Sequence, residues 1–389
     1  MGIAKKMKNW LALWSNQFCL YRIVNRRCED GDDVLIIKLD AIGDFIIWLD
    51  SAKEYKKIYS SQKCILLCSS VCKDLAYATD YFDDVLALDV KKFEKDKEYQ
   101  LHELDKLSSK KYKILVQTAY SRTQHMDMIA ASIPATEKIG FIADESKSNV
   151  SRYLLTNFNR KKMDRVYDKL IETSKAPMME LQRNADFIRK LKNEEFKSSI
   201  PQLPSLENKL QYKNPYVVIF PGASTPVKMW GTDKYAKVIE YLQLRTNWDI
   251  WICGGKQESY LYDDICKKLI QTDNIKNYCG KTNLIDLIEV VRNAKLVLSN
   301  DTSGIHYAAA TGVPGICPFG EYNYGRFLPY DSDEQKALIH ICSAQVKCRN
   351  CADRHMTVKC ISHIIRKGRY LCLELVTVDM VKKAIERYL

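Results

Sequence analysis

One stretch of the chain combines residue types that can bind an anion. An apolar run at 296–298 leads directly into small polar residues, and an alanine-rich helix is predicted at Ser303–Ala310. The first amides of a helix have no partner inside it, and a phosphate can be that partner. We therefore predict that Thr302, Ser303 and Gly304 bind an anion, with the glycine letting the ligand approach the main chain. The alternative is an ordinary capped connection between a strand and a helix.

This stretch is one of a series of motifs that together resemble glycosyltransferase family 9, the family of the lipopolysaccharide heptosyltransferases. In chain order the motifs are Val34 to Asp44 with its closing Gly-Asp pair, Pro221-Gly-Ala223 followed by Lys228-Met-Trp230, Cys253-Gly-Gly-Lys-Gln-Glu258, Gly280-Lys-Thr-Asn-Leu284 and Asn300 to Pro314. The resemblance covers about residues 34 to 330. One departure is Ser303, which stands where the family pattern usually has glycine, with Gly304 next.

The resemblance implies both a fold and an activity. The fold is GT-B, an α/β architecture of two doubly wound Rossmann-like domains that face each other across a cleft. The activity is that of an inverting, metal-independent glycosyltransferase, which moves a sugar from a nucleotide-sugar donor to a hydroxyl of a glycan or glycolipid acceptor. We expect heptose from an ADP-heptose-like donor, an acceptor of the lipopolysaccharide type, and no cofactor for catalysis.

Asp44 is the candidate catalytic base. It follows the first predicted strand and stands beside Gly43 at the start of a helix, where it matches the family's catalytic aspartate. A carboxylate there would activate the acceptor hydroxyl. The alternative is a carboxylate that only complements the helix dipole. Asp40 is close enough in sequence to be a second carboxylate, and the two roles could be exchanged.

Stabilising the departing diphosphate without a metal requires cations and fixed dipoles. The turn at 302–304 would supply amides and hydroxyls, and Lys228, which matches the family's lysine, would supply a positive charge. His306 lies one turn along the helix and either reaches a phosphate or packs. Gly222 and Glu258 are the candidate nucleotide contacts, and Glu258 either accepts both ribose hydroxyls, as the matching family acid does, or caps its own helix.

Two arginines are candidate acceptor contacts. Arg122 follows the strand predicted at Ile114–Gln117, where it would bind a phosphate or carboxylate of the acceptor. Its alternative is an ordinary surface arginine. Arg326 follows the strand predicted at Gly315–Pro318, near the mouth of the donor site.

A cysteine cluster lies near the C-terminus, at residues 348–372. Its four thiols, which are Cys348, Cys351, Cys360 and Cys372, include one tight pair. Four thiolates can complete a tetrahedral site for zinc or iron. Some relatives in the family that modify autotransporter proteins carry a similar cluster that binds iron. The alternative is four reduced cysteines, and His355 or His363 could replace one ligand.

The overall composition is that of an ordinary globular protein with an excess of positive charge. Hydrophobic residues make up 46% of the chain, charged residues make up 28%, and the net charge is +12. This charge favours anionic partners, such as nucleotide sugars, phosphorylated glycolipids and anionic membranes. Nucleic acid is not predicted, because no RNP, zinc-finger or helix-turn-helix signature is present.

The N-terminal segment 1–30 is basic and amphipathic. Its first 27 residues carry Lys and Arg but no Asp or Glu, with Trp, Leu and Phe between them. It either lies on an anionic membrane surface as a peripheral contact or packs on the protein body. Because neither a membrane span nor a signal peptide is evident, a cytoplasmic location is expected, at the inner face of the cell membrane if this segment binds lipid.

Strands and helices alternate along both halves of the chain, which predicts parallel sheets. The predicted strands are Val34–Leu39, Cys64–Cys68, Val85–Leu88, Ile114–Gln117, Glu137–Phe141, Tyr216–Phe220, Asp249–Cys253, Lys295–Ser299 and Gly315–Pro318. The predicted helices of the second half include Asp233–Leu244, Glu258–Ile270 and Leu284–Asn293. A polar stretch with prolines separates an acceptor-side domain at 31–205 from a nucleotide-sugar domain at 206–389.

Other functions remain open at this stage. One is a protein O-heptosyltransferase of the autotransporter-modifying type. Another is a non-catalytic nucleotide-sugar-binding protein of the same fold. A dehydrogenase would fit the doubly wound pattern, but the glycine fingerprint of dinucleotide binding is missing after the first strand.

Overall fold

The structure is a computed structural model that describes residues 30–142, 164–174, 178–205, 212–331, 336, 338–351 and 356–389. The amphipathic segment predicted at the N-terminus, except for Asp30, lies outside the described residues, as does His355.

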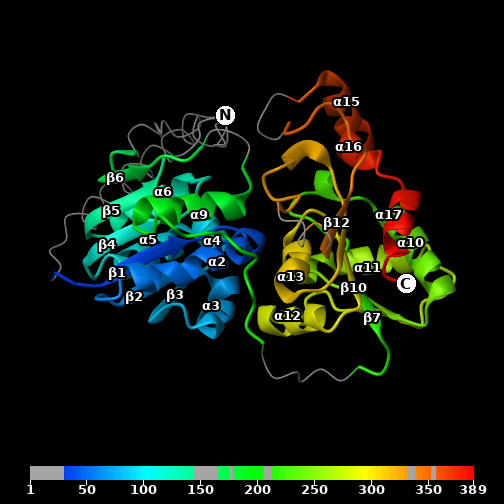
Figure 1. Cartoon of the computed structure of the whole chain (residues 1–389), viewed down its shortest axis with the longest axis horizontal. Coiled ribbons are helices and arrows are strands. Elements are labelled where there is room, and N and C mark those ends of the chain that lie inside the picture. Colours follow the sequence, from blue (N-terminus) through cyan, green and yellow to red (C-terminus); the bar gives the residue numbers. More distant parts are fainter. Residues whose placement is uncertain are drawn as a thin grey trace, which may run out of the picture. The chain divides into compact units, whose positions relative to one another are not determined.

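The first sheet has six parallel strands in the order β3-β2-β1-β4-β5-β6 (Figure 1). Its strands are β1 Val34–Lys38, β2 Cys64–Ser69, β3 Asp84–Leu88, β4 Tyr112–Gln117, β5 Ala135–Phe141 and β6 Lys169–Ile171. Its main helices are α2 Ile42–Ile58, α3 Lys73–Thr79, α4 Val90–Lys95, α5 Lys97–Leu107, α6 Gln124–Ser132 and α9 Glu180–Leu191. The single-turn η1 Ser70–Cys72 precedes α3.

The second sheet repeats this topology, with the order β12-β11-β10-β7-β8-β9. Its strands are β7 Tyr216–Phe220, β8 Asp249–Ile252, β9 Ile275–Asn277, β10 Leu296–Ser299, β11 Gly315–Pro318 and β12 Ile339–Cys342. Its helices are α10 Thr232–Arg245, α11 Ser259–Cys266, α12 Leu284–Arg292, α13 Ser303–Thr311, α15 Val358–Lys367, α16 Leu371–Glu374 and α17 Val378–Ile385, with single turns η3 Pro226–Lys228, η4 Lys256–Glu258 and η5 Glu321–Asn323. Both sheets therefore have the doubly wound strand order, which confirms the predicted two-domain α/β fold.

The chain forms two compact units, each built from three separate stretches of the sequence. The first unit comprises the described residues up to Ala41, together with Lys53–Thr173 and Asp186–Phe196. The second comprises Ile42–Ala52, Ser174–Ala185 and Lys197–Leu389. By its contacts, the first part of α2 thus belongs to the second unit and the remainder to the first.

All nine predicted strands are confirmed, but sequence reasoning missed β6, β9 and β12. Each of the three is at an edge of its sheet and is only three or four residues long. A short strand that is covered on one side only shows too few apolar positions for a periodic pattern to emerge. The helix predicted to reach residue 270 also ends earlier, at Cys266.

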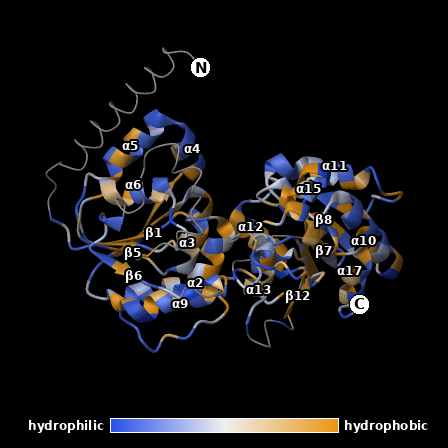
Figure 2. Cartoon of the chain, turned by 90° about the horizontal axis from the view of Figure 1, so that it is seen from above, coloured by the Kyte–Doolittle hydropathy of each residue, from blue (hydrophilic) through white to orange (hydrophobic). Residues whose placement is uncertain are grey.

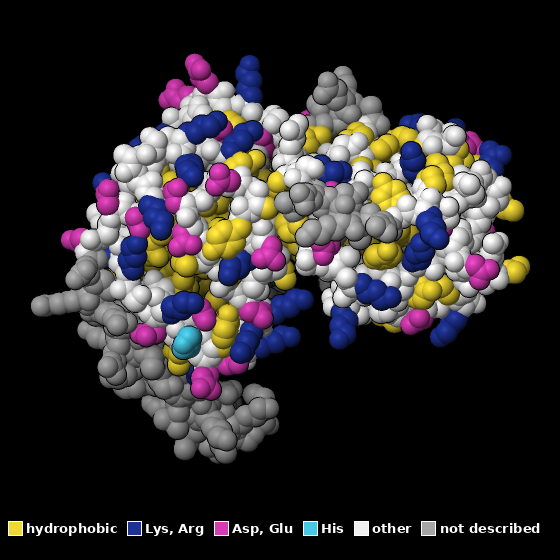
Figure 3. Space-filling view, turned by 90° about the horizontal axis from the view of Figure 1, so that it is seen from below, with side chains coloured by type: hydrophobic (Ala, Val, Ile, Leu, Met, Phe, Trp, Pro, Cys, Tyr) yellow, Lys and Arg dark blue, Asp and Glu magenta, His cyan; other side chains and the backbone are white. Residues whose placement is uncertain are grey.

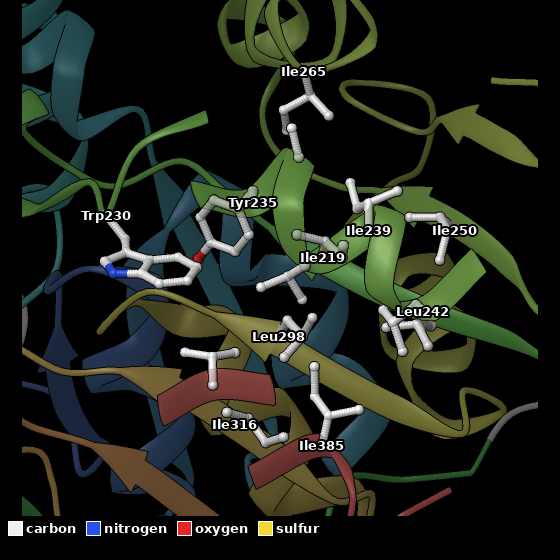
Figure 4. Packing of buried hydrophobic residues seen from close by; sticks show 14 of the residues in the cluster. Ile219, Trp230, Tyr235, Ile239, Leu242, Ile250, Ile265, Leu298, Ile316 and Ile385 are labelled. Carbon is white, nitrogen blue, oxygen red and sulfur yellow. The ribbon is translucent and has the colours of Figure 1, made fainter. Parts of the chain in front are cut away.

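Apolar strands form the core of each unit, and in Figure 2 they are largely hydrophobic, whereas the helices carry both kinds of residue. In the second unit, Trp230 from the Lys-x-Trp motif packs edge-on against Tyr235 within this core (Figure 4). Its indole nitrogen donates to the carbonyl of Val376 at 2.9 Å, which satisfies a polar group that would otherwise be buried alone. Trp230 thereby anchors the loop that carries Lys228.

The surface is mixed, and Figure 3 shows basic and acidic side chains interspersed with hydrophobic ones on one face. Among the described residues, no helix combines the length and the apolar character needed to cross a bilayer.

Candidate active site

The predicted donor residues meet at one edge of the second sheet. Strands β7 and β10 are neighbours, and Phe220 pairs with Ser299 at their carboxyl ends. The chain order reverses between these two strands, and doubly wound sheets bind ligands outside such a point. The Pro-Gly-Ala loop after β7 and the predicted anion turn after β10 therefore emerge side by side.

Asn300 ties these two loops together. Its amide nitrogen donates to the carbonyls of Pro221 at 2.7 Å and Gly222 at 3.0 Å. Its amide oxygen accepts from the main-chain N–H of Trp230 at 3.2 Å and from the hydroxyl of Tyr235 at 3.1 Å. The side chain is fully buried, so all of these bonds form away from water. Sequence reasoning did not single out this residue, because all of its partners lie 65 or more residues earlier in the chain.

The anion turn has the predicted form. Helix α13 begins at Ser303, with Thr302 at the N-cap, and among the described residues Thr302 makes no side-chain capping bond. The Thr302 hydroxyl instead lies 3.2 Å from the hydroxyl of Ser299. The first amides of α13 thus lack the usual cap, which leaves them suited to an anion.

Gly304 has a different role from the predicted one. A Cβ at this position would lie 2.4 Å from the ring of Phe220 and 2.6 Å from the hydroxyl oxygen of Ser299. The missing side chain therefore makes room for the ends of β7 and β10, and the approach of a ligand to its main chain remains a prediction. The main-chain N–H of Gly304 still lies in the first turn of α13, where helix amides have no partner inside the helix.

Charged side chains gather beside the turn. Burial raises the pKa of the Asp301 carboxyl, while the positive charges of Lys228 and Arg326 and hydrogen bonds from Tyr322 and Asn323 lower it. The ammonium of Lys228 also stands 5.4 Å from the centre of the Tyr322 ring. Lys228 therefore lies close to the anion turn, as predicted. Asp301 and Tyr322 are members of the site that the sequence analysis missed.

Arg326 is held by an ion pair at the same site. Its Nε lies 2.9 Å from Oε1 of Glu180, and the Glu180 main-chain N–H donates to the Arg326 carbonyl at 2.7 Å. The guanidinium also lies over the ring of Phe327, 4.9 Å from its centre. These contacts fix the direction of the arginine, and its role toward an acceptor remains a prediction.

Gly222 and Glu258 are in direct contact, as expected of residues that share a subsite. A Cβ on Gly222 would lie 1.9 Å from Oε1 of Glu258, so a larger residue would displace the carboxylate from this position. Oε2 of Glu258 accepts from the Gly255 N–H at 2.6 Å. The carboxylate thus caps the short turn η4 and not the helix α11 that follows, while its other oxygen lies over the Pro-Gly-Ala loop.

His306 is buried and electrically neutral. Its Nδ1 lies 2.9 Å from the hydroxyl of Tyr330, and burial lowers the pKa of the imidazole to about 4. At neutral pH the side chain therefore adds no positive charge to the anion turn. Of the two predicted roles, packing accounts for these contacts.

Asp44 lies in the first turn of α2, in the part of that helix that belongs to the second unit. A Cβ on the preceding Gly43 would lie 3.2 Å from the ring of His306 and 3.5 Å from the Cα of Ser303. The beginnings of α2 and α13 are therefore packed together, and glycine permits this approach. Asp44, the candidate base, therefore follows directly on the residue that packs against the anion turn.

Asp40 has a separate environment in the first unit. Its carboxylate forms a 2.7 Å ion pair with Lys38, a lysine that is almost fully buried. It lines a cavity of about 220 Å³ at the carboxyl ends of β1, β3 and β4, together with Phe93, Glu94 and His125. A carboxylate already paired with a lysine is a weaker candidate for the base.

The prediction for Arg122 was wrong. Its side chain is fully buried, forms an ion pair with Asp164, lies 3.5 Å from Asp127, and stacks over the ring of Tyr167 at 4.6 Å. Tyr167 in turn donates to Asp127 at 2.8 Å. This buried network gives Arg122 a structural role, and the arginine is neither an acceptor contact nor an ordinary surface residue.

The four predicted cysteines line one cavity of about 200 Å³. Burial raises the pKa of Cys372 to about 12, and the nearby thiols of Cys351 and Cys360 add to this shift. Within the described ranges, however, no three His, Cys, Asp or Glu side chains stand close enough to hold a metal ion in this arrangement. The thiols converge on one space without forming a closed coordination shell.

Comparison with known proteins decides the family. The sequence profile of glycosyltransferase family 9 (heptosyltransferase) matches residues 126–362. The chain belongs to glycosyltransferase family 9. The resemblance inferred from the motifs is thus confirmed for the part of this family 9 chain that holds the donor-side residues. Asp44 precedes the matched range, so its role remains a prediction.

Individual relatives match parts of this family 9 chain. Lipopolysaccharide heptosyltransferase 3 of Escherichia coli K12 is 32% identical over 121 residues, which span 31% of this chain and 35% of the relative. The chain thus matches only about a third of the length of this curated relative.

Solved structures share the fold. The ADP-heptose lipopolysaccharide heptosyltransferase II of Escherichia coli is similar with a TM-score of 0.64 at 15% identity, covering 92% of this chain and 98% of that one. The iron-containing dodecameric glycosyltransferase TibC of enterotoxigenic Escherichia coli gives a TM-score of 0.55 at 13% identity, covering 93% and 77%. Both likenesses support the GT-B architecture predicted from the motifs.

Proposed function

We propose that this family 9 protein is an inverting glycosyltransferase that needs no metal for catalysis. Its donor would be a nucleotide-activated heptose of the ADP-heptose type, and its acceptor a hydroxyl of a lipopolysaccharide-type glycan. The names of the matched relatives support heptose and a lipopolysaccharide acceptor. A lipid-anchored acceptor would place the reaction in the cytoplasm, at the inner face of the membrane.

The observation that carries this proposal is the uncapped start of α13 beside Lys228. The α13 amides and the Lys228 ammonium would receive the charge that develops on the diphosphate as its bond to the sugar breaks. Because Asn300 fixes both loops, these groups are held in place before the reaction starts. Gly222 and Glu258 would hold the nucleoside at the neighbouring loop.

Asp44 would provide the base. Its carboxylate would take the proton of the acceptor hydroxyl, whose oxygen attacks the anomeric carbon from the face opposite the diphosphate. The bond between that carbon and the diphosphate oxygen then breaks, and the configuration inverts. The packing of Gly43 against Ser303 and His306 supports this role, because it brings the α2 helix start to the anion turn.

The experiment combines binding with turnover. Thermal shift against a panel of nucleotide sugars should show the largest stabilisation with ADP-heptose, because a ligand that binds only the folded state raises its stability. Incubation with ADP-heptose and a truncated lipopolysaccharide acceptor should then release ADP with heptose transfer. If the protein binds the donor but neither transfers the sugar nor hydrolyses the donor, the non-catalytic alternative would be supported. Transfer only to an autotransporter polypeptide would support the protein-modifying alternative.

We also propose that the four cysteines bind zinc or iron. The supporting observation is that Cys348, Cys351, Cys360 and Cys372, predicted as ligands from their spacing alone, line a single cavity. Thiolates are the ligands that zinc and iron share in such sites. Because burial keeps Cys372 protonated, metal binding would release protons and draw the thiols together. The metal would stabilise this part of the chain and take no part in the transfer.

A further inference from the structure

Helix α15 exposes an apolar face that the proposed chemistry does not use. Val358 is 80% exposed, Ile361 42% and Ile365 79%. Their spacing of three and four residues places them on one side of the helix. In Figure 1, α15 lies with α16 at the top of the second unit, above β12. Most other exposed apolar side chains of the described chain stand singly, whereas these three share one helix.

The charged side chains that α15 itself carries are all basic. Lys359, Arg366 and Lys367 belong to the same helix and are exposed, and α15 contains no acidic residue. Arg369 follows the helix and forms a 3.3 Å ion pair with Glu374. In Figure 2 the helix shows both hydrophobic and hydrophilic residues. An apolar face beside several cations of the same helix is the pattern of helices that lie in the surface of an anionic membrane.

We infer that α15 is a membrane-docking helix that inserts Val358, Ile361 and Ile365 among acyl chains and places its cations on lipid phosphates. Each basic side chain near an anionic leaflet adds to the attraction, and shallow insertion needs only a small apolar area. This docking surface lies in the described C-terminal part of the chain and is distinct from the segment predicted at the N-terminus.

A second copy of the chain fits this face less well. A stable interface buries roughly 800 Å² on each partner, which three side chains of one short helix do not supply. In a symmetric pair, the basic residues of both helices would also face each other. Charge complementarity thus favours lipid over self-association.

The test uses the full chain and two matched pairs of substitutions. Val358→Ser with Ile365→Ser removes two side chains of the apolar face. Leu244→Ser with Ile270→Ser removes two equally exposed side chains, 84% and 102% exposed, elsewhere in the second unit. Cosedimentation is measured with vesicles of phosphatidylcholine alone and with added phosphatidylglycerol.

Wild type should prefer the anionic vesicles, and high salt should weaken its binding. The first pair should weaken partitioning by roughly tenfold or more, whereas the second pair should leave it unchanged. Replacing Lys359, Arg366 and Lys367 with Gln should abolish the preference for anionic lipid. Melting temperature and donor binding should be unaffected in every variant, which separates this inference from the proposed function.

A local measurement completes the test. Hydrogen exchange of the amides at 356–370 should slow when anionic vesicles are added, because insertion protects the helix. Unchanged exchange there, or equal partitioning of the first pair and wild type, would overturn the inference. Loss of self-association in the first pair, without any change in vesicle binding, would assign the face to contacts between copies instead.

Discussion

The side-chain nitrogen of Asn300 donates to the carbonyl of Gly222 at 3.0 Å, so one amide joins the anion turn after β10 to the Pro-Gly-Ala loop after β7. The same side chain accepts from the N–H of Trp230, two residues after Lys228. Two loops that are far apart in sequence are therefore held together by one buried residue. Preorganised dipoles of this kind stabilise developing charge without having to move during the reaction.

Asn300→Ala should weaken binding of the nucleoside diphosphate roughly tenfold or more and lower stability by about 3 kcal/mol, because four hydrogen bonds lose their partner. Calorimetry and denaturant unfolding would measure the two effects. Asn274→Ala is the matched control, since Asn274 bonds to Trp248 and Gln243 at the amino ends of the strands. It should lower stability and leave the affinity unchanged. Equal losses of affinity in both variants would contradict the positioning role.

Asp44→Asn should reduce the transfer rate by roughly 100-fold or more while donor affinity stays within a few-fold, because an amide cannot accept the proton. Single-turnover kinetics would measure the rate. Asp40→Asn is the comparison, since Asp40 is the other candidate carboxylate and is paired with Lys38. A larger loss of rate in Asp40→Asn would exchange the two roles.

Lys228→Ala should weaken binding of the donor and of the nucleoside diphosphate by roughly tenfold or more, because in the proposed site its cation would bind the diphosphate. Binding of the nucleoside should hardly change. Calorimetry with all three ligands would check this, with Lys237→Ala on the exposed side of α10 as the control. An equal effect on the nucleoside would show that Lys228 acts through folding.

His306 should make the protein sensitive to acid. Its pKa is lowered from 6.5 to about 4 by burial, so between these values the unfolded chain binds a proton that the folded chain cannot. The stability contributed by this difference is lost as pH falls from about 6.5 to about 4, by up to about 3 kcal/mol. The free energy of unfolding, measured with denaturant at each pH, should fall more steeply with decreasing pH for wild type than for His306→Gln. Parallel slopes would disprove the assignment.

The cysteine cavity should contain close to one zinc or iron per chain in protein purified without a metal-affinity tag. Replacing Cys348 and Cys351 together with Ser should remove the metal and lower the melting temperature, because the site binds metal only in the folded chain. Elemental analysis would measure the metal. Cys266→Ser, on α11 outside this cavity, should leave the metal in place. Full metal content in the double variant would show that these residues are ordinary reduced cysteines and not metal ligands.

Much of the fold and the donor site could be predicted from the sequence. Alternating apolar strands and amphipathic helices indicate parallel sheets, and loops after neighbouring parallel strands must emerge at the same edge. The helix start after Thr302 was predicted from the local pattern, and Lys228 was singled out by its match to the family motif; both lie beside the paired ends of β7 and β10. These features depend on local pattern and on chain order, which the sequence contains.

Only the tertiary structure decided the direction of individual side chains. Arg122 points inward because Asp127, Asp164 and Tyr167 surround it, and Asp164 is 42 residues away in sequence. Gly304 is required by the packing of Phe220, which the sequence pattern did not indicate. Burial and pairing depend on which distant residues pack together, and the spacing of residue types along one chain does not record those contacts.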